Sequence, residues 1–373
     1  MRNLASVQKV IAVEPIEGAD RIELARVLGW QVVIRKGEFK VGDLGVYFEV
    51  DSVLPELPQF EFMKDRKYRI KTIKLKGQLS QGLLLPLSSF SFPCVVVEGS
   101  DVTDFIGVKK YDPPETQIFM PPQPKGFWWN LVYTLPFLKM FRKKVGTGTA
   151  FPTHLVPKTD EPRLQAFSSD FLETYKDLQV SITQKMDGTS ATYIWYKRKF
   201  SIASRNVWFI NKTSGNVYAD MANDLDLKSA MKKVFGSRNI AIQGEIVGPN
   251  VQGNKYKFDR TQFFLFGAYD IDKQEYLTVG ELDDVYNKLY AVIENHRFTK
   301  VDEIRRGPIK AIGLTVNDWL NFASSKSRFN PKTWDEGIVI RSLDNKPYGI
   351  RGMAGKRWSA KVVSNEFLLQ WGL

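Results

Sequence analysis

Cysteine and histidine are almost absent from this chain of 373 residues, which has one cysteine, Cys94, and two histidines, His154 and His296. A single cysteine excludes an intramolecular disulfide and a cysteine-rich zinc site. Neither histidine stands in a spacing with carboxylates that would indicate a metal or acid–base site. We expect an intracellular protein, cytoplasmic or nuclear, because one cysteine suits a reducing compartment and residues 1–14 lack a secretory signal.

Long hydrophobic runs are missing as well. One apolar stretch, residues 127–138 from Phe127 to Leu138, contains Asn130 and Pro136 and is followed by a basic cluster. A bilayer span needs about 20 apolar residues, so we expect no membrane span. The stretch could pack between domains, or it could contact a partner or a membrane surface, and the sequence leaves these alternatives open.

Acidic residues are in deficit, with 41 Asp and Glu against 53 Lys and Arg, which gives a net charge of +12. Such an excess favours polyanionic partners, and nucleic acid in particular, through the long-range field and counterion release. A merely basic protein would have the same count, because the count does not locate the charges. The hydrophobic content of 43% and the length predict two packed domains and argue against disorder.

Residues 1–112 have the pattern of an OB-like β-barrel, with short strands separated by turn residues. Strands are expected at residues 30–34, 45–50, 68–75 and 82–85, and one helix at 19–27. Lys71, Lys74 and Lys76 belong to the most basic part of this region, and Lys74 and Lys76 alternate with Ile73 and Leu75 across an expected strand. One face would then be cationic and suited to RNA, although a solvated strand face is the alternative.

Residues 113–150 are rich in proline and are expected to form a connector. Residues 151–373 predict a catalytic domain of antiparallel sheets with flanking helices, so the whole chain is expected to be α+β. The expected helices lie at residues 171–175 and 222–235, and the expected strands at 180–184, 192–196, 240–244, 263–268 and 337–341.

Lys185 carries the most specific chemical signal, because residues 184–188 read Gln-Lys-Met-Asp-Gly and fit the K-x-D-G pattern of enzymes that attach a nucleotide to their own lysine. A lysine that attacks an α-phosphate must lose its proton and lie in line with the leaving pyrophosphate, which requires fixed charges around it. The pattern alone also fits a strand that ends in a turn.

Further short motifs follow Lys185 in a fixed order. Each of them is common when it occurs alone, but together they form the ordered signature of covalent nucleotidyltransferases. They centre on Arg205, Glu245, Phe266, Glu336 and Lys361.

Residues 159–373 resemble the catalytic domain of ATP-dependent RNA ligases. The preceding OB-like region resembles the branch of that family in which the OB domain comes first, and residues 18–24 and 76–82 also resemble OB modules of the tRNA-binding type. DNA ligases and capping guanylyltransferases continue beyond the last motif into a C-terminal OB domain. Here the chain stops shortly after Lys361, which argues against both.

The resemblance implies a role for each motif residue. Lys185 would form lysyl-AMP, while Asp187, Glu245 and Glu336 would hold Mg²⁺ or Mn²⁺ through water, with ribose contact as the alternative for Glu245. Phe266 would stack on adenine and Lys361 would hold the α-phosphate. The remaining nucleotide-site residues implied are Gly188, Arg205, which could instead bind the RNA 5′-phosphate, and Arg163, which lies in the segment Asp-Glu-Pro-Arg and would reach the adenylate.

One position departs from the wider family. Many relatives have two lysines separated by one residue in the last motif, and Ser359 stands where the first would be. The double contact to phosphate is therefore not carried over, although Lys356 or Arg357 could supply a nearby cation.

These features predict an ATP-dependent RNA ligase that joins 3′-OH and 5′-phosphate ends, at nicks in duplexes or breaks in RNA, through lysyl-AMP and RNA-adenylate. Two alternatives remain at this point. The first is a GTP-using capping-type nucleotidyltransferase, and the second is a non-catalytic nucleic-acid-binding protein.

Overall fold

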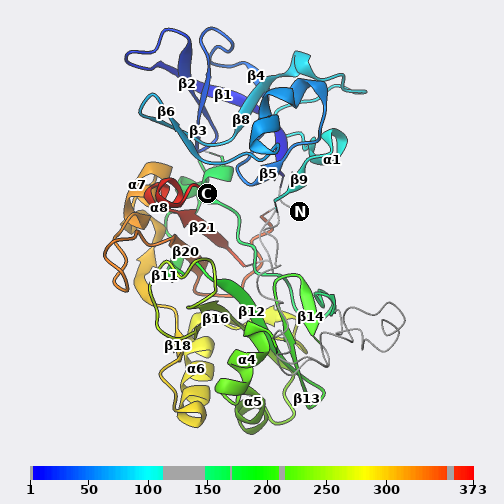
Figure 1. Ribbon diagram of the computed structural model, residues 1–373, viewed down its shortest axis with the longest axis vertical. Helices are drawn as coiled ribbons and strands as arrows, with labels where there is room; N and C mark the ends of the chain where they lie inside the picture. The colour runs from blue at the N-terminus through cyan, green and yellow to red at the C-terminus, as the bar shows by residue number, and fades with distance from the viewer. Residues whose placement is uncertain (1–2, 112–147, 169, 210–214, 351–356) are drawn as a thin grey trace, which may run out of the picture.

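A computed structural model describes residues 3–111, 148–168, 170–209, 215–350 and 357–373. They form a smaller β-barrel part stacked on a larger part built from two sheets and several helices (Figure 1). The predicted α+β class is confirmed. Residues 113–147 of the expected connector, including the stretch 127–138, lie outside the described residues, so the domain boundaries and the role of that stretch remain predictions.

The β-barrel part is built around an antiparallel five-stranded sheet in the order β3-β2-β1-β4-β8. A bulge between Val10 and Ala12 bends β1, which pairs with β2 through one half and with β4 through the other. Trp30, Phe48 and Phe60 are fully buried within it. Its elements are β1 (Ala5–Pro15), β2 (Ile22–Val27), β3 (Trp30–Arg35), β4 (Leu44–Phe48), β5 (Ser52–Val53), η1 (Pro58–Arg66), β6 (Ile73–Leu75), β7 (Gln78–Ser80), β8 (Leu83–Pro86), η2 (Leu87–Ser89), α1 (Thr103–Ile106) and β9 (Lys109–Lys110).

The helix predicted at residues 19–27 is wrong, because Ile22–Val27 forms strand β2. Several of its residues are good helix formers, but the strand pairs with β1 on one side and β3 on the other. Leu24, Ala25 and Val27 are buried. Two ladders of backbone hydrogen bonds and this burial outweigh a weak local preference for helix.

The strand predicted at residues 68–75 is also too long. Only Ile73–Leu75 forms strand β6, which pairs with β7 in a short hairpin. Lys76 lies in the turn of this hairpin with a φ of 46°. Lys74 and Lys76 are both exposed, but they do not alternate along one strand as expected.

The larger part contains an eight-stranded sheet and a four-stranded sheet, whose pairings are antiparallel except that β16 and β18 are parallel. The eight-stranded sheet comprises β10 (Thr149–Ala150), β12 (Thr189–Tyr196), β13 (Lys199–Ala203), β14 (Val207–Phe209), β15 (Ile240–Val247), β16 (Gln262–Asp270), β17 (Glu275–Tyr276) and β18 (Phe298–Lys300). The four-stranded sheet comprises β19 (Glu303–Pro308), β11 (Gln179–Lys185), β20 (Gly337–Ser342) and β21 (Ser359–Val363), in that order.

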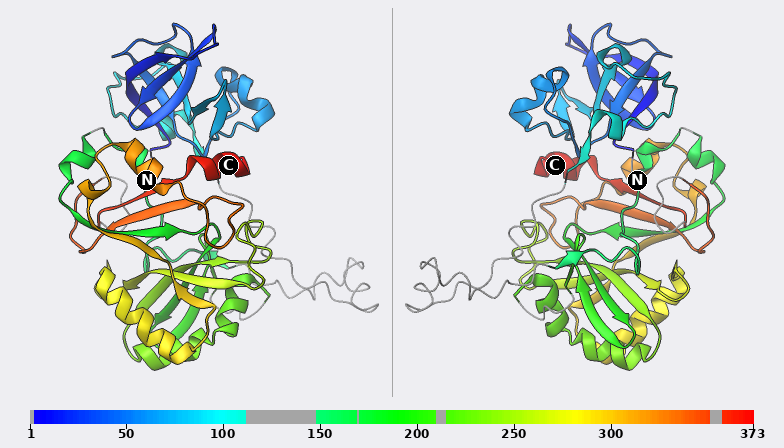
Figure 2. Two further views of the ribbon diagram at one scale, coloured as in Figure 1. Left: turned by 90° about the vertical axis from the view of Figure 1, so that its left-hand side faces the viewer. Right: turned by 90° about the vertical axis from the view of Figure 1, so that its right-hand side faces the viewer.

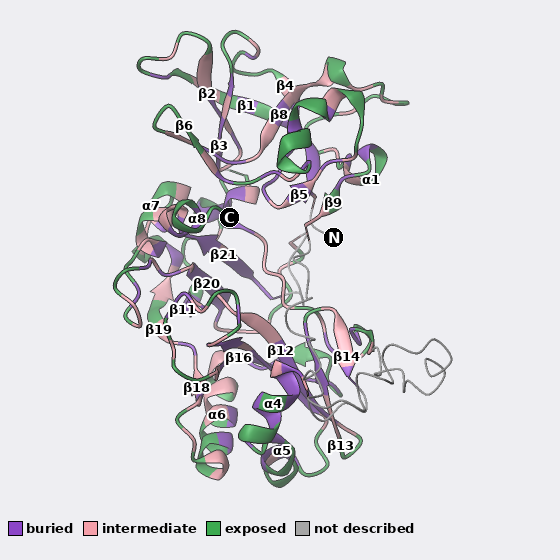
Figure 3. Ribbon diagram, in the orientation of Figure 1, coloured by how far each residue is buried: buried purple, intermediate pink, exposed green. Residues whose placement is uncertain are grey.

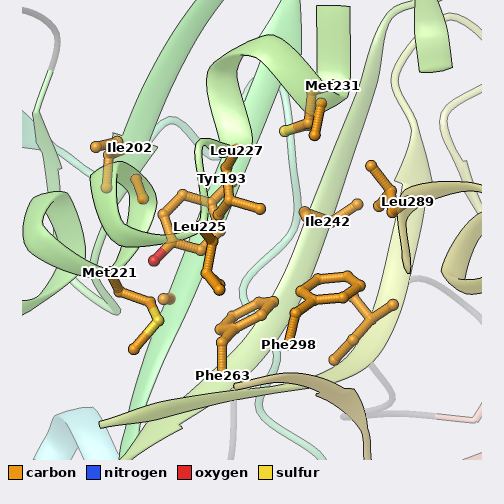
Figure 4. Packing of buried hydrophobic residues seen from close by; sticks show 14 of the residues in the cluster. Tyr193, Ile202, Met221, Leu225, Leu227, Met231, Ile242, Phe263, Leu289 and Phe298 are labelled. Atoms are coloured by element: carbon orange, nitrogen blue, oxygen red, sulfur yellow. The ribbon is translucent and has the colours of Figure 1, made fainter. Parts of the chain in front are cut away.

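Helices α4 (Val217–Asp224), α5 (Leu227–Phe235) and α6 (Val279–Ile293) pack on one face of the eight-stranded sheet (Figure 1). Met231 and Leu289 from the helices lie over Tyr193, Ile242 and Phe263 from the strands (Figure 4). The single helix predicted at residues 222–235 is wrong. The chain breaks between α4 and α5 at Asp226, whose φ of 44° a continuous α-helix does not allow.

The outer face of the four-stranded sheet packs on α3 (Phe171–Thr174), η5 (Leu164–Ala166), η6 (Ile309–Ala311) and α7 (Val316–Ala323). Val180 and Ile182 of β11 and Ile338 and Ile340 of β20 point into this core. Because side chains alternate along a strand, the intervening residues of β11 and β20 face the other sheet. The strands are largely buried in this region (Figure 3). Every second side chain of β11 and β20 therefore faces the space between the two sheets.

The two parts touch at several points, and helix α8 (Asn365–Trp371) lies next to the barrel (Figure 2). Lys71 Nζ donates to Gly372 O at 2.8 Å, and Gln81 Nε2 donates to Asn365 Oδ1 at 3.2 Å. Gly29 N donates to Gln165 O at 3.0 Å. Within the described residues, no helix is both long and apolar enough to cross a bilayer.

Candidate active site

A cavity of about 200 Å³ lies between the two sheets. Its walls contain six of the residues predicted from the motifs, namely Lys185, Gly188, Arg205, Glu245, Phe266 and Lys361. These residues are far apart in the sequence, and antiparallel pairing brings their strands together. The cavity lining also includes Asp160, Glu161, Thr183, Val339 and Arg341.

Lys185 is the last residue of β11, and its Nζ donates to Glu336 Oε1 at 2.6 Å. Burial lowers the pKa of Lys185, but the negative charges of Glu336, Glu245 and Asp187 outweigh it, so the pKa is raised above its usual value. Lys185 is therefore a protonated partner of Glu336. Its conversion to a nucleophile requires removal of a proton.

The carboxylates around Lys185 crowd one another. Burial, together with the charges of Glu336 and Asp187, raises the pKa of Glu245 to about 8, although Lys185 opposes this shift. Burial and Glu336 likewise raise the pKa of Asp187 to about 6, although Lys255 opposes the shift by bonding to its carboxylate. A further cation near these groups would relieve their repulsion.

One carboxylate oxygen beside Lys185 is able to accept a further ligand. Glu336 Oε2 is buried without a hydrogen-bond partner, so an acceptor oxygen remains for a ligand beside Lys185. Among the residues that the structure describes, no three His, Cys, Asp or Glu side chains converge closely enough to hold a metal directly. Contact with a cation through water stays a prediction for Asp187, Glu245 and Glu336.

If Lys185 accepts AMP as the motifs predict, its raised pKa means that this attachment should accelerate as the pH rises. Below that pKa, each pH unit increases the fraction of free amine about tenfold, while ionisation of Asp187 and Glu245 over the same range favours cation binding. We expect the initial rate to rise continuously from about pH 6 to about pH 8 when Mg²⁺ is limiting. Label from ATP on the protein measures the rate, and a constant or falling rate would contradict the prediction.

Glycine is required at two motif positions for steric reasons. A Cβ at Gly188 would lie 2.3 Å from Ile246 O and 2.9 Å from Glu245 Cγ, so a larger residue would displace Glu245. Gly337 has a φ of 145°, and a Cβ there would lie 2.1 Å from Val362 O. Both glycines let motif segments approach neighbouring strands closely.

Three cations converge on Asp160, which lines the cavity. Lys361 Nζ lies 3.4 Å from Asp160 Oδ1, Arg205 Nη2 lies 3.5 Å from Asp160 Oδ2, and Lys110 of the barrel bonds to the same carboxylate. Burial alone would raise the pKa of Asp160, but Lys361, Lys110 and Arg205 lower it well below its usual range. This cluster of positive charge suits a phosphate. Sequence reasoning missed Asp160, although it lies three residues before Arg163.

A buried ion pair lies beside Phe266 in the cavity. Arg341 Nη2 donates to Glu161 Oε1 at 2.7 Å, and Arg341 Nη1 donates to Phe266 O at 3.2 Å. The guanidinium carbon of Arg341 lies 5.5 Å from the centre of the Phe266 ring. The predicted stacking residue is thus fixed next to a charged pair that the motifs did not reveal. The only sequence signal was the position of Glu161 two residues before Arg163.

Arg163 does not line the described part of the cavity. Its Nη2 donates to Asp51 Oδ2 of the barrel at 3.3 Å, and its guanidinium carbon lies 5.9 Å from the centre of the Trp30 ring. Its backbone forms a bridge to Lys361. The structure therefore places Arg163 where the two parts meet, and its predicted contact with the adenylate remains untested.

Ser359 lies two residues before Lys361 on β21, directly opposite Arg341 of β20. Arg341 therefore places a cation next to the position at which many relatives have a lysine. Arg357 is buried, with its guanidinium carbon 4.1 Å from the centre of the Tyr276 ring, and it does not line the described part of this cavity. Lys356 lies outside the described residues.

The expected RNA-binding lysines are on the barrel. Lys74 and Lys76 belong to the exposed β6–β7 hairpin, whereas Lys71 is exposed and donates to Gly372 O near the end of α8. The structure thus places two of these lysines at exposed positions of a hairpin and the third at the contact between the parts. RNA binding by all three remains a prediction.

Comparisons with known proteins agree with this geometry. A family model described as an OB-fold domain matches residues 4–87, and one described as RNA ligase matches residues 178–363. The solved structure of Naegleria gruberi RNA ligase with PPi is 31% identical over 99% of this chain and 98% of that chain, with a TM-score of 0.80. A mutant of that ligase with ATP and Mn is 30% identical over 100% of this chain and 98% of that chain, also with a TM-score of 0.80.

A further mutant of the Naegleria ligase, solved with AMP and Mn, is 30% identical over 98% of each chain, with a TM-score of 0.79. No curated protein sequence matches the chain. The family resemblance inferred from the motifs, including an N-terminal OB-like domain, is confirmed by these matches.

Proposed function

The chain belongs to the RNA ligase family, and from this premise we propose that it uses ATP to join an RNA 3′-hydroxyl to an RNA 5′-phosphate, at nicks in duplexes or at breaks. The observation that carries the proposal is the position of Lys185. Its side chain lines a cavity whose walls also contain carboxylates, the cations of Arg205 and Lys361, and the ring of Phe266. This arrangement suits an attack on the α-phosphate of ATP.

In the first step, Lys185 Nζ loses its proton and forms a bond to the α-phosphorus. The bond from that phosphorus to the oxygen bridging the α- and β-phosphates breaks, and pyrophosphate leaves. Lys361 and Arg205, released from Asp160, would neutralise charge on the phosphates. Phe266 would orient the base by stacking, and the buried walls would exclude water from the lysyl-AMP bond.

ATP and Mg²⁺ or Mn²⁺ are the expected cofactors, and the Naegleria ligase was solved with ATP and Mn. When bound, the cation would supply positive charge beside Asp187, Glu245 and Glu336, and so lower the pKa of Lys185. The crowding of these carboxylates and the partnerless Glu336 Oε2 support this assignment.

In the second step, an RNA 5′-phosphate oxygen attacks the phosphorus of lysyl-AMP, and Lys185 leaves with a proton as RNA-adenylate forms. In the third step, the RNA 3′-hydroxyl oxygen attacks the 5′-phosphorus and loses its proton, and AMP leaves. A phosphodiester bond results. The barrel next to the cavity would hold the RNA through its exposed lysines.

Incubation with Mg²⁺ and α-labelled ATP, and separately with α-labelled GTP, tests the proposal on a denaturing gel. We expect label from ATP to remain on the protein and to move to RNA that carries a 5′-phosphate. Label from GTP alone would instead indicate capping. No label from either nucleotide, on folded protein that is free of AMP at the start, would favour a non-catalytic binding protein.

The exposed hairpin of the barrel should matter for sealing and not for AMP attachment. We expect the double variant Lys74→Glu, Lys76→Glu to lower kcat/KM for sealing nicked duplex RNA by about tenfold at moderate salt, because it removes two cations and adds two anions. The rate of AMP attachment should stay unchanged. The double variant Lys228→Glu, Lys232→Glu on α5 makes the same charge change at exposed positions of another surface and serves as the control. Equal sealing by both double variants would contradict this role of the hairpin.

RNA ligase family membership argues against both rival functions, capping and binding without catalysis. We also propose an intracellular location, cytoplasmic or nuclear, where ATP and RNA substrates are available.

A further inference from the structure

We infer that Glu161 selects adenine by accepting a hydrogen bond from the 6-amino group of the base, with Arg341 as the residue that positions its carboxylate. The inference rests on the proposed use of ATP at this cavity. It gives the cavity a means of choosing the base, which stacking on Phe266 cannot do, because every base has a π-face.

The register of the four-stranded sheet supports the inference about where the base lies. Lys185 of β11 lies opposite Gly337 of β20, Thr183 lies opposite Val339, and Ser181 lies opposite Arg341. Along this face, Arg341 is therefore four residues, or about 13 Å of strand, from the reactive end. With the α-phosphate at Lys185, we place the base of the nucleotide toward Arg341.

The position of Phe266, on the other sheet, also places the base near Arg341. Its ring lines the cavity, while its carbonyl oxygen accepts a hydrogen bond from Arg341 Nη1 at 3.2 Å. A base stacked on that ring would present an edge to the pair formed by Arg341 and Glu161, which both line the cavity. Val339 and Val301 also line it and supply apolar surface for the faces of a base.

Glu161 has one oxygen available for a ligand. Arg341 Nε and Nη2 both donate to Oε1, at 3.2 and 2.7 Å. Among the described residues, no hydrogen bond reaches Oε2. The Glu161 side chain is only 12% exposed, so a bond to this oxygen would form largely away from water.

The charge of Glu161 determines which edge of a base it accepts. Burial would raise the pKa of Glu161, but Arg341, Arg357 and Lys361 outweigh burial and lower it to about 2. The group is therefore a carboxylate at neutral pH and can only accept hydrogen bonds. It suits the amino group of adenine and would repel a carbonyl oxygen at the same position.

Purine riboside triphosphate, which differs from ATP only by the absence of the 6-amino group, provides the test. We expect wild-type protein to form its nucleotide adduct with a kcat/KM about 10- to 100-fold higher for ATP than for this analogue, the range for a hydrogen bond to a charged group. In Glu161→Gln, we expect Arg341 to hold the amide oxygen and the NH₂ group to face the base. The preference for ATP should then fall to near one.

The ratio of kcat/KM for ATP to kcat/KM for the analogue distinguishes base recognition by Glu161 from a purely structural role of that residue. An equal loss on both nucleotides in Glu161→Gln, with the ratio unchanged, would overturn the inference and leave Glu161 as a partner of Arg341 only. A wild-type ratio near one would overturn it without any variant, which keeps the test decisive if Glu161→Gln does not fold. Wild-type protein that takes no label from ATP would overturn the proposed function, and the inference with it.

Asp270→Asn is the matched control. Asp270 is another buried carboxylate held by one arginine, with Arg238 Nη2 2.9 Å from its Oδ2, but it lies at the far end of β16 and does not line the cavity. Its loss of charge should leave the preference for ATP unchanged. A change equal to that in Glu161→Gln would show that the preference follows the general state of the fold.

Discussion

Lys185→Arg is expected to abolish attachment of AMP to the protein. Arginine keeps a positive charge beside Glu336, whose Oε1 lies 2.6 Å from Lys185 Nζ, so the ion pair can be retained. A guanidinium has a pKa above about 12 and cannot lose its proton in this site, so it cannot attack phosphorus. The measurement is label from α-labelled ATP that survives a denaturing gel.

The same variant separates the first step from the last. Sealing of RNA that already carries a 5′-adenylate does not need a new bond to Lys185, so Lys185→Arg should retain part of this activity. Lys310→Arg, on the opposite side of the four-stranded sheet and paired with Asp177, is the matched control and should label normally. Stable label on Lys185→Arg would show that another residue is the nucleophile.

Lys361→Met is expected to slow attachment of AMP by about 10²- to 10³-fold. Lys361 N donates to Pro162 O at 2.8 Å, so the backbone of β21 is fixed and the side chain projects toward Asp160 from a rigid strand. Methionine keeps much of the apolar stem and removes the cation, so the loss would reflect charge stabilisation where negative charge develops. Single-turnover rates of label transfer to the protein measure it.

The effect of Lys361→Met should extend to the sealing of RNA that already carries a 5′-adenylate, because the proposed mechanism keeps the adenylate phosphorus at the same site in later steps. This distinguishes Lys361 from Lys185, whose loss should affect that reaction much less. Lys361→Arg should recover part of the rate by restoring a cation. A loss below about fivefold in Lys361→Met would contradict a role at the α-phosphate.

Much of the chemistry could be predicted from the sequence because the motif residues carry it individually. The motifs predict a nucleophilic lysine at Lys185, a carboxylate near it at Glu245 and a stacking ring at Phe266 without coordinates. Strands β11 and β20 were also predictable. Ile182, Ile338 and Ile340 alternate with cavity-facing residues at the period of two that a strand requires. The motif glycines Gly188 and Gly337 are explained by the structure, because a Cβ at either position would clash with a neighbouring strand.

Errors arose where distant residues decide local structure. Ile22–Val27 has several good helix formers, yet pairing with β1 and β3 makes it a strand. The break at Asp226 depends on how α4 and α5 both reach the same core. Local propensity is weak, at less than about 1 kcal/mol per residue, so tertiary contacts reverse it readily.

The sequence by itself determined the family and the alternation that places Lys185, Val339 and Lys361 on one face, and it predicted Lys185 as the nucleophile. Only the tertiary structure decided the partners of these residues: Asp160 for Lys361, Glu161 for Arg341, and Asp51 for Arg163. Charged pairs of this kind join residues up to 201 positions apart and leave no periodic pattern. They form because buried charges must be paired, and which charges meet depends on how the two sheets and the barrel pack.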